Sequence, residues 1–200
     1  SLIADKDLPL KGKFLIQMFE KSSLRTRLSF YLAMRQLGGG VLNLRKDELH
    51  LGEGGENIAD TSKIISSYGD IFMLRTDSEE KFEEFKNNLE IPIISGLSPD
   101  NHPVQILSDI FTIEEIKKKN ISKLLLCWIG DCNNVLNSLV EASVKFEFKL
   151  RISSPKKYGP RKKTLNLIKK KSSKIKFFSY PKDAIKNADV VFADKFISLN

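Results

Sequence analysis

The chain of 200 residues lacks the features that mark several classes of protein. Its two cysteines, Cys127 and Cys132, are too few for a disulfide framework and lack the spacing of a metal site, so we expect free thiols and no metal. We also expect no cofactor. No apolar run reaches the roughly 18 residues that a membrane-spanning helix needs. No charged-then-apolar leader opens the chain either. We therefore expect no membrane partner and a reducing compartment, the cytoplasm.

The glycine fingerprint of dinucleotide-binding folds is also missing. The run from Trp128 to Val135 follows an apolar segment, where such a fingerprint would begin, but Gly130 is its only glycine. Asn133 and Asn134 follow instead, and their amides are suited to the head group of an amino acid. The alternative is that one of them only caps the next helix.

Basic residues exceed acidic ones, 33 to 25, which gives a formal net charge of +8. The excess lies in lysine-rich runs at 117–119, 156–163 and 169–174. These runs lack interleaved aromatic side chains, which argues against a platform for stacking bases. The pattern favours a solvated, lysine-rich surface, and we expect no nucleic-acid partner.

Strand-like and helix-like segments alternate along the chain. The predicted strands are 14–18, 41–44, 71–74, 91–94, 124–129, 149–152, 175–178 and 190–193. The predicted helices are 26–37, 58–67, 79–87, 104–118, 134–145, 162–171 and 183–187. Alternation of this kind predicts an α/β protein whose parallel sheets are covered on both faces.

The helix predicted at 104–118 separates two halves of the chain. We expect a first α/β domain over residues 1–119, with this helix as a bridge, and a second over residues 120–200. The second half ends just after a strand with no following helix, so we expect it to be an incomplete domain.

The stretch from Ser23 to Arg27 is the most informative part of the sequence. It lies where the first predicted strand turns into a helix, and the first N–H groups of a helix lack internal partners. The hydroxyls of Ser23 and Thr26 and the guanidiniums of Arg25 and Arg27 make this position suited to a doubly charged phosphate. The alternative is a capped helix whose arginines face solvent.

Other polar groups follow a strand end or precede a helix. Arg75 and Thr76 come at the end of the third strand, and neighbouring parallel strands bring their ends to one crevice. His102 and Gln105 flank the start of the bridging helix, where the pair can polarise a carbonyl oxygen. The alternative for Arg75 is an ion pair with a surface carboxylate, and the alternative for His102 is an ordinary loop residue.

Two further segments hold candidate residues. Asp194 and Ser198 lie just past the last strand, where a carboxylate can bind a cationic amine; the alternative is a surface aspartate. His50 begins a polar, glycine-bearing loop over 50–56, of a kind that can reach a neighbouring subunit; the alternative is a flexible connector.

Together, these motifs resemble a known family. The segments are Phe19-Glu20-Lys21-x-Ser23-x-Arg25-Thr26-Arg27, Met73-x-Arg75-Thr76, His102-Pro103-x-Gln105-x-Leu107-x-Asp109, Gly130-Asp131-x-Asn133-Asn134-Val135 and Asp194-x-x-x-Ser198. In this order they resemble the aspartate/ornithine transcarbamylases, and within that family the members that act on ornithine. The Asn-Asn pair and the Asp-Ser segment favour ornithine, because an aspartate enzyme would want cationic groups to hold the second carboxylate.

The resemblance implies transfer of a carbamoyl group from carbamoyl phosphate to the δ-amine of ornithine, as in arginine biosynthesis. It implies that carbamoyl phosphate is bound by Ser23, Leu24, Arg25, Thr26, Arg75, His102 and Gln105, with His50 contributed by the adjacent subunit of a homotrimer. It also implies that Arg75, His102 and Thr26 are catalytic, and that ornithine is bound by Asn134, Asp194, Ser198 and Leu199.

Three departures from the family pattern bear on this expectation. Leu24 stands where threonine is usual, which removes a hydroxyl contact and leaves an acylornithine acceptor as an alternative. Leu199-Asn200 replaces the more usual methionine–glycine. A His-Cys-Leu-Pro segment, a final helix and a helix ahead of Ser1 are absent, so we expect a chain that is incomplete at both ends. A non-catalytic domain that binds phosphate or nucleic acid is the other alternative.

Overall fold

The structure is a computed structural model that describes residues 8–45, 57–171 and 174–194. Contacts between residues divide the chain into two compact units, residues 1–99 and residues 100–200. In the part of the chain described, each unit is built on a four-stranded, all-parallel sheet with helices on its faces. The predicted α/β class with parallel sheets is therefore confirmed.

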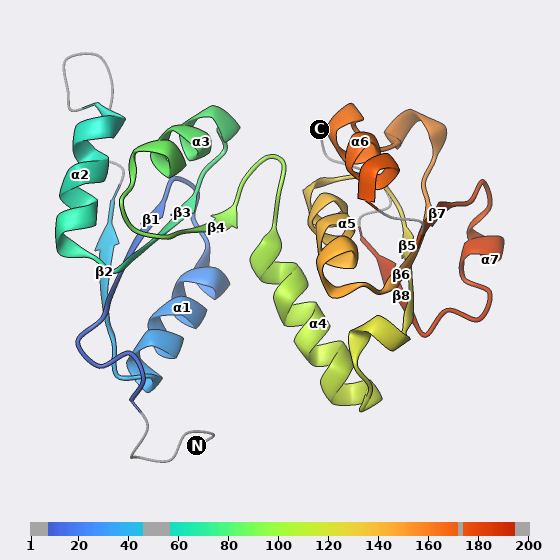
Figure 1. Cartoon of the computed structure of the whole chain (residues 1–200), viewed down its shortest axis with the longest axis horizontal. Helices are drawn as coiled ribbons and strands as arrows, with labels where there is room; N and C mark the ends of the chain where they lie inside the picture. The colour runs from blue at the N-terminus through green and yellow to red at the C-terminus, as the bar shows by residue number, and fades with distance from the viewer. Residues whose placement is uncertain (1–7, 46–56, 172–173, 195–200) are drawn as a thin grey trace. The chain divides into compact units, whose positions relative to one another are not determined.

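The first unit alternates strands and helices in chain order (Figure 1). Its elements are β1 (Phe14–Phe19), α1 (Leu24–Gln36), β2 (Gly40–Leu44), α2 (Ile58–Tyr68), β3 (Ile71–Arg75), α3 (Glu79–Asn88) and β4 (Ile93–Leu97). The strand order is β2-β1-β3-β4. The two central strands, β1 and β3, are therefore direct neighbours.

The apolar side chains of β1 and β3 alternate between two core clusters, as the strand period of two requires. Leu15 and Met73 pack with Met34 of α1 on one face of the sheet. On the other face, Ile16 and Phe72 belong to the cluster that α2 and α3 complete. Strands buried on both faces read as continuous apolar runs, which is why the sequence marked them clearly.

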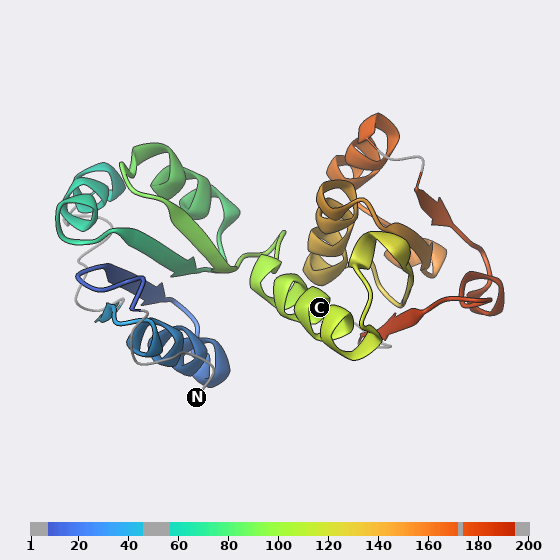
Figure 2. The ribbon, with the colours of Figure 1, turned by 60° about the horizontal axis from the view of Figure 1, so that its bottom comes forward.

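The second unit has the same layered construction (Figure 2). Its elements are α4 (Pro103–Lys117), the 3₁₀ turn η1 (Ile121–Lys123), β5 (Leu125–Ile129), α5 (Asn134–Phe146), β6 (Lys149–Ser153), the 3₁₀ turn η2 (Lys156–Tyr158), α6 (Lys162–Lys171), β7 (Ile175–Phe177), α7 (Pro181–Ala184) and β8 (Val190–Ala193). The strand order is β7-β6-β5-β8. One core cluster joins α4, α5 and the sheet.

The helix α4 contributes Ile106, Ile110 and Ile113 to the core of the second unit. The contacts accordingly group this helix with residues 100–200. The sequence instead predicts a boundary after residue 119, with this helix as a bridge that belongs to the first domain. That boundary stays a prediction, since a helix that links two domains can pack its apolar face on either of them.

Two predicted elements are displaced by two residues or more at both ends. The strand predicted at 91–94 is β4, which begins at Ile93 and ends at Leu97. Proline has no N–H to donate to a sheet, so Pro92 precedes the strand and contributes only its carbonyl, which accepts from the Phe72 N–H at 2.9 Å. The helix predicted at 183–187 is α7, which begins at Pro181, since proline is suited to the first turn of a helix.

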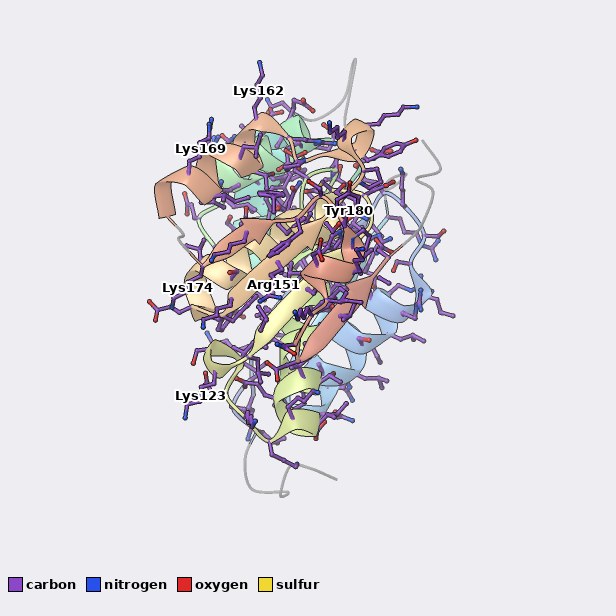
Figure 3. All side chains as sticks on the ribbon, turned by 90° about the vertical axis from the view of Figure 1, so that its right-hand side faces the viewer. Lys123, Arg151, Lys162, Lys169, Lys174 and Tyr180 are labelled. Atoms are coloured by element: carbon purple, nitrogen blue, oxygen red, sulfur yellow. The ribbon has the colours of Figure 1, made fainter. Side chains whose placement is uncertain are left out.

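The lysine-rich character of the chain belongs mainly to the second unit. Residues 100–200 hold 20 of the 33 lysines and arginines. Lys123, Lys162 and Lys169 are exposed and extend away from the ribbon (Figure 3). This arrangement agrees with a solvated basic surface. Within the described residues, no helix combines the length and apolar character that crossing a bilayer would require.

Candidate active site

The carboxyl ends of β1 and β3 bring together polar residues that are about fifty positions apart in the sequence. The two strands pair in parallel with Phe19 opposite Arg75. The Glu20 N–H then donates to the Arg75 carbonyl at 3.0 Å, so the chain leaving β1 stays beside the end of β3. This confirms the expectation that the two strand ends share one edge of the sheet.

The guanidinium of Arg75 lies against two hydroxyls from the start of α1. Its Nη1 donates to Ser23 Oγ at 3.2 Å and to Thr26 Oγ1 at 3.4 Å. No carboxylate among the described residues pairs with Arg75, and its buried Nε has no hydrogen-bond partner among them. Burial lowers the pKa of Arg75, which as an arginine nonetheless remains charged. A partly buried cation without a counter-ion favours an anionic ligand.

Ser23 occupies the N-cap position of α1 but does not cap the helix with its side chain. The first helical hydrogen bond runs from the Arg27 N–H to the Ser23 carbonyl at 3.3 Å. The N–H groups of residues 24–26 therefore have no acceptor within the helix. With the helix dipole and the exposed side chain of Arg25, they form a site of the kind that binds phosphate.

Glu20 is a buried carboxylate that holds the turn after β1 in place, a role that the sequence did not predict. Its side chain is only 2% exposed. It accepts hydrogen bonds from the hydroxyl of Thr76 and from the ammonium of Lys81 in α3. The carboxylate thus ties the turn after β1 to the chain that follows Arg75. The sequence signal was present, in a lone acid beside the Ser-x-Arg-Thr-Arg run, but its partners become visible only in the fold.

Gly96 allows the sheet to bulge beside Arg75. The register between β3 and β4 shifts at this point, so that Leu74 pairs with Ser95 but Arg75 pairs with Leu97. A Cβ atom added at Gly96 would lie 2.4 Å from the sulfur of Met73 and 3.4 Å from Cβ of Arg75. Bulges commonly re-aim a side chain next to a functional site, and at this one the glycine leaves room for the buried Met73 side chain.

We expect Gly96→Ala to lower the free energy of unfolding by about 1–3 kcal/mol, because the buried Met73 must move to admit the methyl group. Urea denaturation followed by circular dichroism measures the change. Gly159→Ala is the matched control, since its added Cβ would meet only an ordinary contact of 3.5 Å. Equal stability of the two variants would contradict the proposed crowding at Gly96.

A second group of polar residues lines a pocket of about 270 Å³ within the second unit. Its lining includes His102, Gln105, Asp109, Trp128, Phe192 and Asp194. His102 is the N-cap residue of α4, and Pro103 follows in the first turn. The sequence had placed His102 and Gln105 together at a helix start, and Asp194 past a strand; the structure brings all three to one pocket.

Two side chains of α5 fix the loop that carries His102. Ser138 Oγ accepts from the His102 N–H at 2.8 Å, and Asn137 Nδ2 donates to the Asp100 carbonyl at 2.9 Å. Ser138 is 3% exposed. The backbone at His102 is therefore held by two partly buried hydrogen bonds from one helix.

Asn133 caps α5 and also reaches Asp194. Its Oδ1 accepts from the N–H groups of Val135 and Leu136, and its Nδ2 donates to a carboxylate oxygen of Asp194. The capping alternative raised for the Asn-Asn pair is correct for Asn133, which at the same time orients Asp194. Asn134 is the first residue of α5, beside this contact.

Three of the predicted site residues, His50, Ser198 and Leu199, lie outside the described residues. The others form two groups: Ser23, Leu24, Arg25, Thr26 and Arg75 in the first unit, and His102, Gln105, Asn134 and Asp194 in the second.

Neither cysteine is prepared to act as a nucleophile. Burial raises the pKa of the Cys127 thiol and also that of the Cys132 thiol. Since the thiolate is the reactive form, we expect both to react with iodoacetamide at about pH 8 more slowly than after unfolding in urea. Peptide mass spectrometry follows each site separately. Faster labelling of either thiol in the native protein would contradict this assignment.

The fold and these groups define a two-unit α/β protein with an arginine and two hydroxyls at a helix start of the first unit and an acidic pocket in the second. The chain belongs to the aspartate/ornithine carbamoyltransferase family. Residues 3–115 match the carbamoyl-P binding domain of that family, and residues 122–200 match its Asp/Orn binding domain. The family resemblance of the motifs is thereby confirmed.

Relatives of this chain carry the name ornithine carbamoyltransferase. The protein from Mesorhizobium japonicum is 41% identical over 195 residues, which cover 98% of this chain and 64% of that protein. A solved structure from Pyrococcus furiosus matches with a TM-score of 0.86 and 35% identity, covering 96% of this chain and 62% of that one. The anabolic enzyme from Campylobacter jejuni matches with a TM-score of 0.84 and 32% identity, covering 98% and 66%. The chain spans about 61–64% of the length of the curated relatives that it matches.

Proposed function

We propose that this protein transfers a carbamoyl group from carbamoyl phosphate to the δ-amine of ornithine, giving citrulline and phosphate. The single observation that carries the proposal is Arg75, a partly buried cation held by Ser23 and Thr26 at the open start of α1, with no carboxylate partner among the described residues. The family membership and the names of the relatives support the same reaction.

In this proposal residues of the first unit bind the phosphate of the donor. Ser23, Arg25 and the N–H groups of residues 24–26 bind the phosphate, with Leu24 contributing only its backbone. Arg75, Thr26 and His102 stabilise the negative charge that develops on the carbonyl oxygen, and Gln105 contacts the carbamoyl group. Most of the rate enhancement then comes from positioning and preorganised charge.

The acceptor belongs to the second unit in this proposal. Asn134 and Asp194 bind the amino-acid head group of ornithine, together with Ser198 and Leu199. The neutral δ-amine attacks the carbonyl carbon, the bond from that carbon to the phosphate oxygen breaks, and the amine passes a proton to the departing phosphate. No covalent enzyme intermediate is required.

We further propose a homotrimer in the cytoplasm, acting in arginine biosynthesis, with His50 of each subunit serving the site of its neighbour. The family resemblance supports the trimer. The two free thiols agree with a reducing compartment. Light scattering of the full-length protein measures the subunit number directly.

Citrulline formation by the full-length protein tests the reaction. The acceptor panel should contain ornithine, acetylornithine, succinylornithine, putrescine and aspartate, because Leu24 at the open helix start leaves an acylated ornithine as an alternative. Turnover with ornithine alone is expected. Thermal protection by an oligonucleotide, with none by carbamoyl phosphate beyond that of inorganic phosphate, would instead indicate a non-catalytic binding domain.

A further inference from the structure

The start of α6 is tied to the loop that precedes α4 through one asparagine of α5. Asn137 Nδ2 donates to the Asp100 carbonyl at 2.9 Å, and Asn137 Oδ1 accepts from Thr164 Oγ1 at 2.7 Å. Asn137 is 9% exposed and Thr164 is 7% exposed, so the bond between them is shielded from water. The loop carries His102 two residues after Asp100. An unbroken chain of hydrogen bonds therefore joins α6 to the backbone beside His102.

Chemistry leaves this chain of bonds a single direction. The Asp100 carbonyl can only accept, so the Asn137 amide must present its NH₂ group to it and its oxygen to Thr164. The Thr164 hydroxyl must then donate, although a hydroxyl can otherwise also accept. Thr164 thus holds the amide in the one orientation that supports Asp100.

A second tie joins α6 to the same loop through charge. The Asp100 carboxylate pairs with Arg161, the residue before α6, and lies 3.8 Å from Nζ of Lys163. The first turn of α6 has no acidic residue of its own, although the positive end of the helix dipole favours one there. Asp100 supplies that negative charge from outside the helix. The Arg161 side chain is 61% exposed, so this tie is screened by salt and is weaker than the buried one.

We infer that Thr164 is a positioning residue for the proposed reaction, acting through Asn137 and Asp100 to hold the loop that presents His102. The inference rests on the proposed function, in which His102 stabilises the charge that develops on the carbonyl oxygen. A group with that role must be in place before the charge forms, because its effect comes from preorganisation. Thr164, Asn137 and Asp100 also line a cavity of about 180 Å³, which gives the amide room to turn away once its partner is lost.

Thr164→Val keeps the shape of the side chain but removes its hydroxyl, which leaves the buried oxygen of Asn137 without a donor. We expect kcat for citrulline formation by the full-length protein to fall by about five- to tenfold, the value of one buried hydrogen bond. Thr164→Ser retains the donor and should keep kcat within about twofold of the wild type. The KM for ornithine should change by less than about twofold in both variants, since other residues are assigned to the acceptor.

Ser143→Ala is the matched control. Ser143 is on α5 and is 1% exposed, and its hydroxyl donates to the Phe148 carbonyl at 2.9 Å. This variant also loses one buried hydrogen bond of the second unit, so urea denaturation should show a similar loss of stability in Ser143→Ala and Thr164→Val. The control should nevertheless retain the wild-type kcat. An equal loss of kcat in both variants would make Thr164 a purely structural residue and overturn the inference.

Arg161→Ala tests the weaker tie. We expect kcat to fall by about twofold at low ionic strength, and to match the wild type at about 0.5 M sodium chloride, where the exposed pair is screened. A larger loss than that of Thr164→Val would place the main tie on charge and overturn the assignment to Thr164.

Hydrogen exchange follows the loop without the reaction. The His102 N–H, which donates to Ser138 Oγ, should exchange faster in Thr164→Val than in Ser143→Ala. Faster exchange in a protein whose wild type makes no citrulline would count against the proposed function and leave the tie itself intact. Unchanged exchange and unchanged kcat in a folded Thr164→Val protein overturn the inference.

A second variant applies if Thr164→Val does not fold. Asn137→Asp keeps the size of the side chain and can still accept from Thr164, but it turns the donor to the Asp100 carbonyl into an acceptor. We expect kcat to fall at least as far as in Thr164→Val. An undiminished kcat in Asn137→Asp overturns the inference equally.

Discussion

Replacing Arg75 with alanine should lower kcat/KM for carbamoyl phosphate by about 10²–10³-fold in the full-length protein, the range seen when one preorganised donor to a developing oxyanion is removed. Arg75 bridges Ser23 and Thr26, so its loss also leaves both hydroxyls without the donor that orients them. Citrulline formation at varied carbamoyl phosphate measures the effect.

Two variants make the Arg75 result specific. Arg75→Lys keeps a positive charge but loses the planar fork, so an intermediate loss is expected. Arg35→Ala, in the exposed last turn of α1, the helix that Ser23 precedes as N-cap residue, should leave turnover unchanged. Near-normal turnover in a folded Arg75→Ala protein would defeat the proposed function.

Replacing Asp194 with asparagine should lower kcat/KM for ornithine by about 10²-fold, because a neutral amide cannot balance a cationic amine in a partly buried site. The affinity for carbamoyl phosphate should change little, since Asp194 is assigned to the acceptor. Initial rates at varied ornithine and saturating carbamoyl phosphate separate the two effects.

Asp189→Asn is the matched control for Asp194. The two aspartates flank β8, and the Asp189 carboxylate accepts from the Leu125 N–H at 2.8 Å, at the opposite end of the strand. We expect this variant to retain ornithine turnover. An equal loss in both variants would point to disturbance of β8 and away from a binding role for Asp194.

The sequence predicted the layered architecture well because both sheets are parallel and buried. Strands such as β1 and β3 appear as short apolar runs between amphipathic helices, and parallel pairing places their ends together. The grouping of Arg75 with Ser23 and Thr26 followed from that rule alone. It required no knowledge of side-chain conformation.

What the sequence did not predict depends on contacts between distant residues. The buried carboxylate of Glu20 gains its meaning from Thr76 and Lys81, which lie more than fifty positions away. The bulge at Gly96 produces no periodic signal, because one extra residue in a strand leaves the apolar pattern almost unchanged. Likewise, Ser138 is an ordinary helix residue until the fold brings the His102 backbone to it.

Helix α5 sets a fixed distance inside the second unit. Asn133 at its start reaches Asp194, and Ser138, five positions further along, holds the backbone of His102. At 1.5 Å per residue the two anchors are spaced by about 7.5 Å along a rigid rod. A shift of α5 along its axis would move Asn133 and Ser138 by the same amount. The spacing between the two contact points is therefore fixed by the helix, and only a change in the side chains at these two positions can alter it.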